Sequence, residues 1–331
     1  MQRIVGVDVA RGLAVLGMVA AHVAEVDDPG SGWLIVTHGR SAAMFAVLAG
    51  LSIGLMSGGT SPCDVRGARW RVAVRAVLLG VLGLLLMALG TPVVVILPSY
   101  ALMFLLLLPA MAWSRPTLLV AAGLTLAVGP PLWLAIDASP FDLPLSLLAG
   151  RYYPAMIWTA YLAVGLALGR SDLRSRQVRW LLAVGGVALV LVGYGGGLLA
   201  QRTVSGTTLL RLVDLEPHAN TAPEMVGNLG VVALVLVACL VLAERAPLLV
   251  APFAATGALA LTAYTGHLVA IAVLQAGGGY RPSLHLLGIF VVVIVAACWA
   301  WRSLWGRGPL ERLLHGASTR VATAVAAPTT T

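Results

Sequence analysis

The sequence contains no lysine, because all 21 of its basic residues are arginine. This absence excludes enzymes that use a lysine nucleophile or a lysine Schiff base. Charge is also scarce: only 10% of the 331 residues are charged, whereas 60% are hydrophobic. Such a composition is typical of a polytopic membrane protein. We therefore explain the net charge of +8 by membrane topology and not by binding of nucleic acid.

Cysteine is rare as well, with Cys63, Cys239 and Cys298 as its three occurrences. These residues form no CxxC motif, and no histidine lies at ligand spacing from them. The pattern therefore predicts neither a disulfide framework nor a metal site.

Long apolar runs dominate the chain. A helix rises ~1.5 Å per residue, so about 20 residues cross the ~30 Å hydrocarbon core of a membrane. The runs predict an all-α bundle of about ten transmembrane helices. They lie near residues 8–26, 38–56, 70–90, 95–113, 117–136, 153–169, 179–199, 222–243, 255–276 and 284–305.

The arginines test this division, because loops that stay in the cytoplasm carry most of the positive charge. If the N-terminus is cytoplasmic, most arginines fall on the cytoplasmic side. The exceptions are Arg40, Arg151, Arg202, Arg211 and Arg281. We therefore expect both termini in the cytoplasm.

We expect a single membrane domain over residues 1–316. After the last span, Pro309 with Leu310, Leu313 and Leu314 predicts a short helix on the membrane surface. Residues 317–331 are poor in core-forming side chains, so we expect a disordered cytoplasmic tail there.

A histidine and an arginine stand at the outer start of the second apolar run, in THGRSAAMF. A helix N-terminus carries partial positive charge, so Arg40 beside it creates a place for an anion or a developing oxyanion. The same field favours neutral His38, the form that acts as a base. In the alternative reading, Arg40 pairs with a lipid phosphate and His38 bonds a loop carbonyl.

Polar residues also gather at the outer ends of later helices, in RYYPAMIW and HANTAPEMVGN. An aromatic belt would explain the tyrosines. Thr221 and Glu224 have the spacing of a capping box, which favours a structural role for Glu224. Asn228, one turn later, is expected to bond between helices. The candidate substrate-binding residues of this group are Arg151, Tyr153, His218, Glu224 and Asn228, and Tyr264 on a later helix is a further candidate.

Ionisable residues inside a span cost ~2.5–3.5 kcal/mol on insertion scales, so each is a functional candidate. His22 lies near the outer end of the first run, and His267 lies inside the ninth, with Tyr264 on the same helix face. A lone buried histidine is usually a satisfied core residue, yet the histidines here gather in the outer half. Asp8 and Arg11 stand at the cytoplasmic edge, where they either pair with each other or bind a ligand.

Several of these motifs resemble a known family. RIVGVDVARGLAVLGMVAAHV followed by HGRSAAMFAVLAGLSIGL resembles the first two helices of the transmembrane acyltransferases typified by heparan-α-glucosaminide N-acetyltransferase, and of their bacterial YeiB-like relatives. YYPAMIWTAYLAVGLALGR, HANTAPEMVGNLGV, LTAYTGHLVAI and GPLERLL resemble the YeiB-like carboxyl-terminal region. The resemblance divides the domain into heparan-acetyltransferase-like helices (1–136) and YeiB-like helices (137–316).

The resemblance implies transfer of an acetyl or other acyl group from a cytoplasmic acyl-CoA, such as acetyl-CoA, to an acceptor on the outer side of a bacterial plasma membrane. The acceptor would be a sugar or a cell-envelope glycan or lipid. Membrane lipids are expected partners, nucleic acid is not, and an oligomer is compatible with the sequence. The family's catalytic histidine lies near the non-cytoplasmic side, which implies His38 or, as the alternative, His22.

An acyltransferase needs three kinds of group. A neutral histidine, His38 or His22 with His267 as a further candidate, deprotonates the acceptor or carries the acyl group. Arg40 stabilises the oxyanion. Cations at the cytoplasmic side hold the phosphates of the donor, and the candidates are Arg11, Arg71 and Arg75. Asp8, the neighbour of Arg11, is counted with them as a residue of the cofactor site.

A transporter or lipid flippase is the alternative function. The outer histidines and arginines would then bind the substrate, and prolines at positions 98, 109, 130 and 131 would mark mobile helices. No inverted repeat is evident, which argues against transport. A non-catalytic scaffold would leave the gathering of histidines unexplained.

Overall fold

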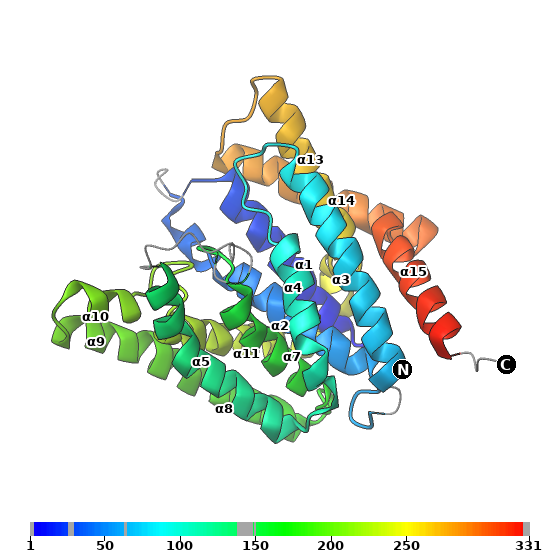
Figure 1. The fold of residues 1–331 in the computed structure, drawn as a ribbon. Helices are drawn as coiled ribbons and strands as arrows, with labels where there is room; N and C mark the ends of the chain where they lie inside the picture. The colour runs from blue at the N-terminus through cyan, green and yellow to red at the C-terminus, as the bar shows by residue number, and fades with distance from the viewer. Residues whose placement is uncertain (1–2, 26–29, 63–64, 138–147, 149, 327–331) are drawn as a thin grey trace. The chain divides into compact units, whose positions relative to one another are not determined.

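The computed structural model describes residues 3–25, 30–62, 65–137, 148 and 150–326. All regular structure within these residues is helical, without a β-strand (Figure 1). The expected all-α class is therefore confirmed, and the apolar composition makes this a helical membrane protein.

Helices long and apolar enough to cross a membrane number seven in the described part of the chain, or eight with one bent pair. The bent pair is α12 (Pro247–Ala258) and α13 (Ala260–Ala276), which meet at 73°. Two shorter apolar helices are α4 (Leu97–Leu107) and α7 (Ala155–Gly169). The seven long segments are α1 (Val5–Val23), Gly32–Met56 with η1 (Gly32–Val36) and α2 (Arg40–Met56), α3 (Val65–Met87), α5 (Arg115–Asp137), Arg176–Thr203 with α8 (Arg176–Val190), η3 (Leu191–Gly195) and α9 (Gly196–Thr203), α11 (Ala222–Arg245) and α14 (Leu284–Trp305).

Each of the ten predicted apolar segments thus overlaps a helix. The segment predicted at 255–276 includes only the last residues of α12, and the segment predicted at 179–199 is divided into α8, η3 and α9. The helix count supports a multi-pass protein, while ten crossings and two cytoplasmic termini stay predictions. The remaining short elements are η2 (Pro109–Ala112) and α10 (Thr207–Leu212).

The chain folds into two compact units, each assembled from separated segments. The first unit takes its described residues from 1–45, 83–95 and 235–315, and the second takes them from 46–82, 96–234 and 316–331. Several helices, α2 among them, contribute to both units.

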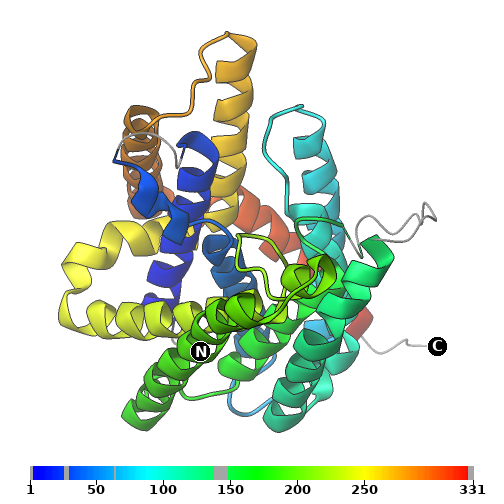
Figure 2. The same cartoon turned by 90° about the vertical axis from the view of Figure 1, so that its left-hand side faces the viewer.

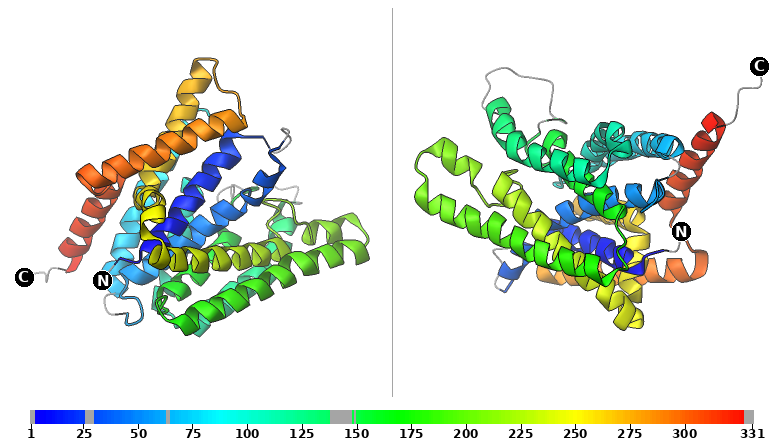
Figure 3. Two further views of the ribbon diagram at one scale, coloured as in Figure 1. Left: turned by 180° about the vertical axis from the view of Figure 1, so that it is seen from behind. Right: turned by 90° about the horizontal axis from the view of Figure 1, so that it is seen from below.

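In the first unit, α1 packs against α12, α13 and α14 (Figure 3). Glycines make the contact with α12 close. A Cβ atom on Gly12 would lie 2.1 Å from the carbonyl oxygen of Phe253, and one on Gly257 would lie 1.8 Å from that of Asp8. Only glycine permits this approach, a common device at helix interfaces in membranes.

The loop between α13 and α14 is tied to the end of α1 (Figure 2). The backbone N–H of Ser283 donates to the carbonyl of Val23 over 2.8 Å, and the Tyr280 hydroxyl donates to the carbonyl of His22. Ser283 also caps α14 by accepting from the N–H of Leu286. These bonds place the end of α1 beside α13.

In the second unit, glycines again bring helices together. A Cβ on Gly165 of α7 would lie 1.9 Å from the carbonyl oxygen of Val47 in α2. A Cβ on Gly193 of η3 would lie 2.2 Å from the backbone nitrogen of Gly227 in α11, so the α8–α9 segment runs alongside α11 (Figure 3).

The C-terminal helix corrects one prediction. Helix α15 spans Pro309–Ala326, so the segment that we expected to be disordered from residue 317 is helical up to Ala326. The reason is tertiary packing on an alanine-rich sequence: Ser318 is completely buried and accepts a hydrogen bond from Arg75. Residues 327–331 lie outside the described residues.

Candidate functional site

Two histidines predicted on separate helices meet in the first unit. Nδ1 of His22, near the end of α1, lies 3.0 Å from Nε2 of His267 in α13. The rings stack with centroids 5.3 Å apart and planes 12° from parallel. His267 is only 1% exposed, whereas His22 is half-buried. The structure therefore forms a histidine pair with one deeply buried member.

A neutral imidazole has one donor and one acceptor nitrogen, so this contact requires one ring to donate to the other. Nδ1 of His267 has no hydrogen-bond partner among the described residues. Tyr264, fully buried, packs edge-on against the His267 ring with centroids 5.1 Å apart. His267 is thus a neutral, buried ring that can orient His22 through their shared hydrogen bond.

His38 and Arg40 lie at the start of α2, as predicted. The Nδ1 of His38 bonds the carbonyl of Leu34 over 3.1 Å, and Arg40 donates to the carbonyl of Ile35 over 2.9 Å. Gly39 between them has φ +69°, a left-handed conformation that favours glycine. These bonds shape the loop, which agrees with the alternative reading for His38.

At the other end of α1, Asp8 and Arg11 pair with each other. The Asp8 carboxylate is 7% exposed and accepts from Arg11 over 2.8 Å and also from Arg3. Arg11 additionally donates to the carbonyl of Gly257. The structural pairing considered for these residues is therefore present in the fold.

The other two candidate donor-binding arginines lie on α3 in the second unit. Nε of Arg71 donates to the carbonyl of Gly67 over 3.3 Å, and Nε of Arg75 donates to the hydroxyl of Ser318 over 3.4 Å. Both side chains are half-buried.

In the second unit, Glu224 organises the loop before α11. Its carboxylate, 3% exposed, accepts from the backbone N–H of His218 over 3.1 Å and from that of Asn220 over 2.8 Å. His218 and Asn220 have φ of 64° and 57°, an uncommon conformation for residues other than glycine. Thr221 accepts from the N–H of Glu224, as expected for its half of a capping box.

Asn228 and Asn220 link this loop to neighbouring helices. The Asn228 amide donates to Tyr161 of α7 and to Glu224, and its carbonyl oxygen accepts from Tyr194 of η3. Asn220 accepts from the indole of Trp158 and donates to the carbonyl of Arg151, each over 2.7 Å. The expected bond between helices at Asn228 is therefore found.

Beside the loop lies a cavity of about 400 Å³ with polar walls, which we call the polar cavity. Arg151 and His218 line it, as do residues that the sequence did not single out. Tyr153 packs edge-on against His218 at 5.1 Å, while Glu224 and Asn228 are buried behind the lining. The additional lining residues include Trp133, Asp137, Arg211 and Asp214, with Arg211 and Asp137 paired over 2.8 Å.

Sequence signals existed for some of these missed residues. Arg211 belongs to the few arginines predicted on the outer side, and Asp137 directly follows the span predicted at 117–136. Tyr280 and Glu311 gave no comparable signal. Glu311 of α15 accepts from the backbone N–H of Leu261 and Thr262 and from the Thr262 hydroxyl, and so caps α13.

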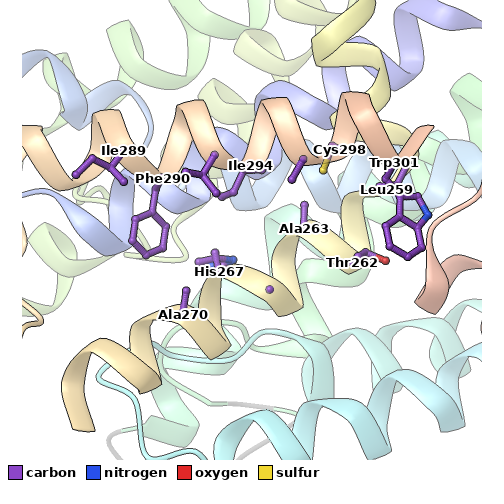
Figure 4. Close-up of a pocket in the computed structure, with 13 residues that line it drawn as sticks. Leu259, Thr262, Ala263, His267, Ala270, Ile289, Phe290, Ile294, Cys298 and Trp301 are labelled. Atoms are coloured by element: carbon purple, nitrogen blue, oxygen red, sulfur yellow. The ribbon is translucent and has the colours of Figure 1, made fainter. Parts of the chain in front are cut away.

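A second cavity of about 360 Å³ lies between α13 and α14 in the first unit, and we call it the apolar groove. Figure 4 shows the Phe290 side chain pointing from α14 toward His267, with Thr262 and Trp301 at the opposite end. His267 therefore belongs both to the histidine pair and to the wall of the groove.

Among the described residues, no group of three or more His, Cys, Asp or Glu side chains is arranged to hold a metal ion. No curated protein matches the sequence. Residues 3–196, more than half of the chain, match the family described as heparan-alpha-glucosaminide N-acetyltransferase, catalytic. That region contains His22 and His38, whereas His267 lies beyond it. The chain belongs to the heparan-alpha-glucosaminide N-acetyltransferase family.

Proposed function

We propose that this protein is a membrane-embedded acyltransferase. It moves an acetyl or other acyl group from a cytoplasmic acyl-CoA to a hydroxyl or amine of a sugar or cell-envelope acceptor on the outer side. The observation that carries the proposal is the 3.0 Å contact between His22 and His267 in a chain of an N-acetyltransferase family.

In this proposal His22 is the catalytic base. When its Nδ1–H donates to Nε2 of His267, the other nitrogen of His22 keeps its lone pair and can take a proton from the acceptor. By accepting this hydrogen bond, His267 holds the orientation and the tautomer of His22, which is the positioning part of the role that an aspartate fills in catalytic triads. The acceptor attacks the acyl carbonyl, its bond to the carbonyl carbon replaces the thioester C–S bond, and the proton that His22 took from the acceptor passes to the leaving sulfur, so that CoA leaves as the thiol.

Arg40 remains our candidate for oxyanion stabilisation, because its guanidinium lies at the N-terminus of α2, where the partial positive charge of the helix adds to its own charge. His38 becomes the second choice for the base, since its Nδ1 is committed to the carbonyl of Leu34.

For the donor, we assign the phosphates to cationic residues of the cytoplasmic side. Arg71 and Arg75 are better suited than Arg11, because Arg11 is already neutralised by Asp8.

For the acceptor, we assign the polar cavity. Arg151, Asp137 and Asp214 supply donors and acceptors for hydroxyl or amino groups, and Trp133 supplies a ring face for a sugar. Glu224 and Asn228 support this cavity from behind rather than contacting the acceptor.

The topology completes the proposal. Ten spans with both termini in the cytoplasm, in a bacterial plasma membrane, bring the donor and the acceptor to opposite sides. The division into residues 1–136 and 137–316 follows the two parts of the family resemblance.

One observation favours transport as the second candidate. The 73° break between α12 and α13 resembles the broken helices that line transporter binding sites. However, the Glu311 carboxylate already accepts hydrogen bonds from the backbone N–H groups of Leu261 and Thr262 at the start of α13, so these groups are not available to an anionic substrate. We therefore rank the acyltransferase first.

The test is CoA release by the full chain in lipid nanodiscs, supplied with acetyl-CoA and amino-sugar acceptors. We expect His22→Ala and His267→Ala to lower kcat/KM by about 10²–10⁴-fold, the usual contribution of general base catalysis. His285→Ala, an exposed histidine at the start of α14, is the matched control and should keep the activity. Absence of CoA release with any acceptor, together with substrate uptake into liposomes, would sink the proposal and favour the transporter.

A further inference from the structure

We propose that the apolar groove holds the hydrocarbon chain of the acyl donor, so that the protein uses acyl groups longer than acetyl. This inference rests on the proposed acyltransferase function and names the donor class for the same site. The groove lies entirely in the first unit, between α13 and α14.

The groove has open space along its middle. Ala263, Gly266 and Ala297 line it with small side chains, between the bulky Phe290 at one end and Trp301 at the other. A Cβ atom built on Gly266 would meet no heavy atom within 4 Å. From Phe290 to Trp301 along α14 the helix rises ~16 Å, a length suited to an extended alkyl chain.

The walls are apolar, which decides what can occupy the groove. Among the described residues that line the groove, Thr262 alone carries a hydroxyl group, and this hydroxyl donates to Glu311. A pantetheine arm carries two amides, each of which loses its hydrogen bonds to water when buried without a partner. The groove offers few such partners, so it suits a hydrocarbon chain better than the pantetheine arm.

The position of His267 indicates that a hydrocarbon chain in the groove belongs to the acyl donor and not to a bilayer lipid. His267 forms part of the groove wall. Its Nε2 atom also contacts the proposed base His22. A chain in the groove therefore ends beside the histidine pair, where the reacting thioester carbonyl has to lie. A tail of a bilayer lipid would fill the same space but would bring no reacting carbonyl, so we commit to the donor's chain.

The experiment measures how acyl-CoA binding and use depend on chain length. Wild-type protein in nanodiscs is supplied with acetyl-, butyryl-, hexanoyl- and octanoyl-CoA, with empty nanodiscs as the blank for partition into lipid. We expect kcat/KM for CoA release to rise by up to roughly fourfold per added methylene, as burial of each methylene predicts. Binding of the same series to His22→Ala, measured by calorimetry, should tighten in the same order.

Gly266→Leu is the variant that fills the groove, and Gly288→Leu is its matched control. A Cβ on Gly288 of α14 also meets no heavy atom within 4 Å, but Gly288 does not line the groove. We expect Gly266→Leu to lose the chain-length dependence and Gly288→Leu to keep it. If Gly266→Leu fails to fold, Ala297→Leu with the control Ala296→Leu replaces the pair, because only Ala297 of these two lines the groove.

Three outcomes separate this inference from the function on which it rests. Equal use of acetyl- and octanoyl-CoA by the wild type would overturn the groove assignment and leave the acyltransferase intact. Binding that depends on chain length and on Gly266, without CoA release, would support the groove and contradict acyl transfer. A phospholipid retained in native mass spectra of Gly288→Leu but lost in Gly266→Leu, with no chain-length dependence, would overturn the inference in favour of a bilayer lipid.

Discussion

The histidine pair and the polar cavity differ in the burial and in the charge of the side chains that form them. In the first unit two imidazoles bond each other among apolar side chains, and the buried ring has only 1% of its surface exposed. In the second unit, Arg211 and Asp137 line the polar cavity with half or nearly half of their side chains exposed. A neutral imidazole can be buried at moderate cost, whereas charged groups need water or a partner. The comparison suggests proton transfer at the first site and recognition of a polar ligand at the second.

The largest expected effect separates the two candidate bases. We expect His22→Ala to lower kcat/KM for CoA release by at least about 100-fold, while His38→Ala changes it by less than about fivefold, because only His22 contacts a second titratable ring. Steady-state kinetics with acetyl-CoA measures both. A larger loss in His38→Ala than in His22→Ala would return the catalytic role to the start of α2.

The second effect concerns stability of the loop beside the polar cavity. Glu224→Ala would leave the buried N–H groups of His218 and Asn220 without their acceptor, which costs about 1–3 kcal/mol for each group. We expect a lower thermal unfolding midpoint in nanodiscs, with Glu216→Ala as the control because Glu216 is exposed. Equal midpoints for the two variants would show that the carboxylate does not hold this loop.

A smaller effect tests recognition in the polar cavity. We expect Arg211→Gln to raise KM for an amino-sugar acceptor about tenfold, a loss near 1.4 kcal/mol, with kcat for the bound complex kept. Its exposed pairing with Asp137 contributes at most about 1 kcal/mol to stability, so unfolding should hardly change. Arg202→Gln on α9 is the control, since Arg202 does not line the polar cavity. Unchanged KM in Arg211→Gln would place the acceptor elsewhere.

The smallest expected effect is a change in stability at alkaline pH. It concerns Tyr280 in the loop between α13 and α14, which is bonded to the end of α1. Burial, with a contribution from the charge of Glu25, raises the pKa of Tyr280 above its ordinary 10.0. The folded protein therefore holds the phenol proton more tightly than the unfolded chain does. This stabilisation is fully present below pH 10 and is lost as pH rises through the raised pKa.

Tyr280→Phe should remove that part of the alkaline destabilisation, together with the hydrogen bond to the carbonyl of His22, worth about 1 kcal/mol at neutral pH. Thermal unfolding at pH 9 and pH 11 of the wild type and the variant gives the comparison. The same loss of stability between these pH values in both proteins would show that Tyr280 does not carry the effect.

The amino-acid sequence by itself determined the class of protein and the positions of its helices. Hydropathy is a local property, so the apolar runs predicted most of the apolar helices, including the short α4 and α7, but they missed α12 as a separate helix before α13. The cap that Thr221 forms and the pairing of Asp8 with Arg11 were likewise predictable, because each joins residues three apart. The Glu224 carboxylate, expected to reach back to Thr221, instead accepts from His218 and Asn220.

Only the tertiary structure decided which distant residues meet. His22 and His267 were separate candidates, and the close approach of α1 to α12 at Gly12 and Gly257, with the Tyr280 tie, accompanies their contact. Residues 317–326 looked disordered because their composition carries no sign of the packing that buries Ser318. Glu311 resembled a surface residue until its carboxylate was found capping α13. Helix formation depends on neighbours in sequence, whereas these contacts depend on shapes and polar groups of elements far apart in the chain.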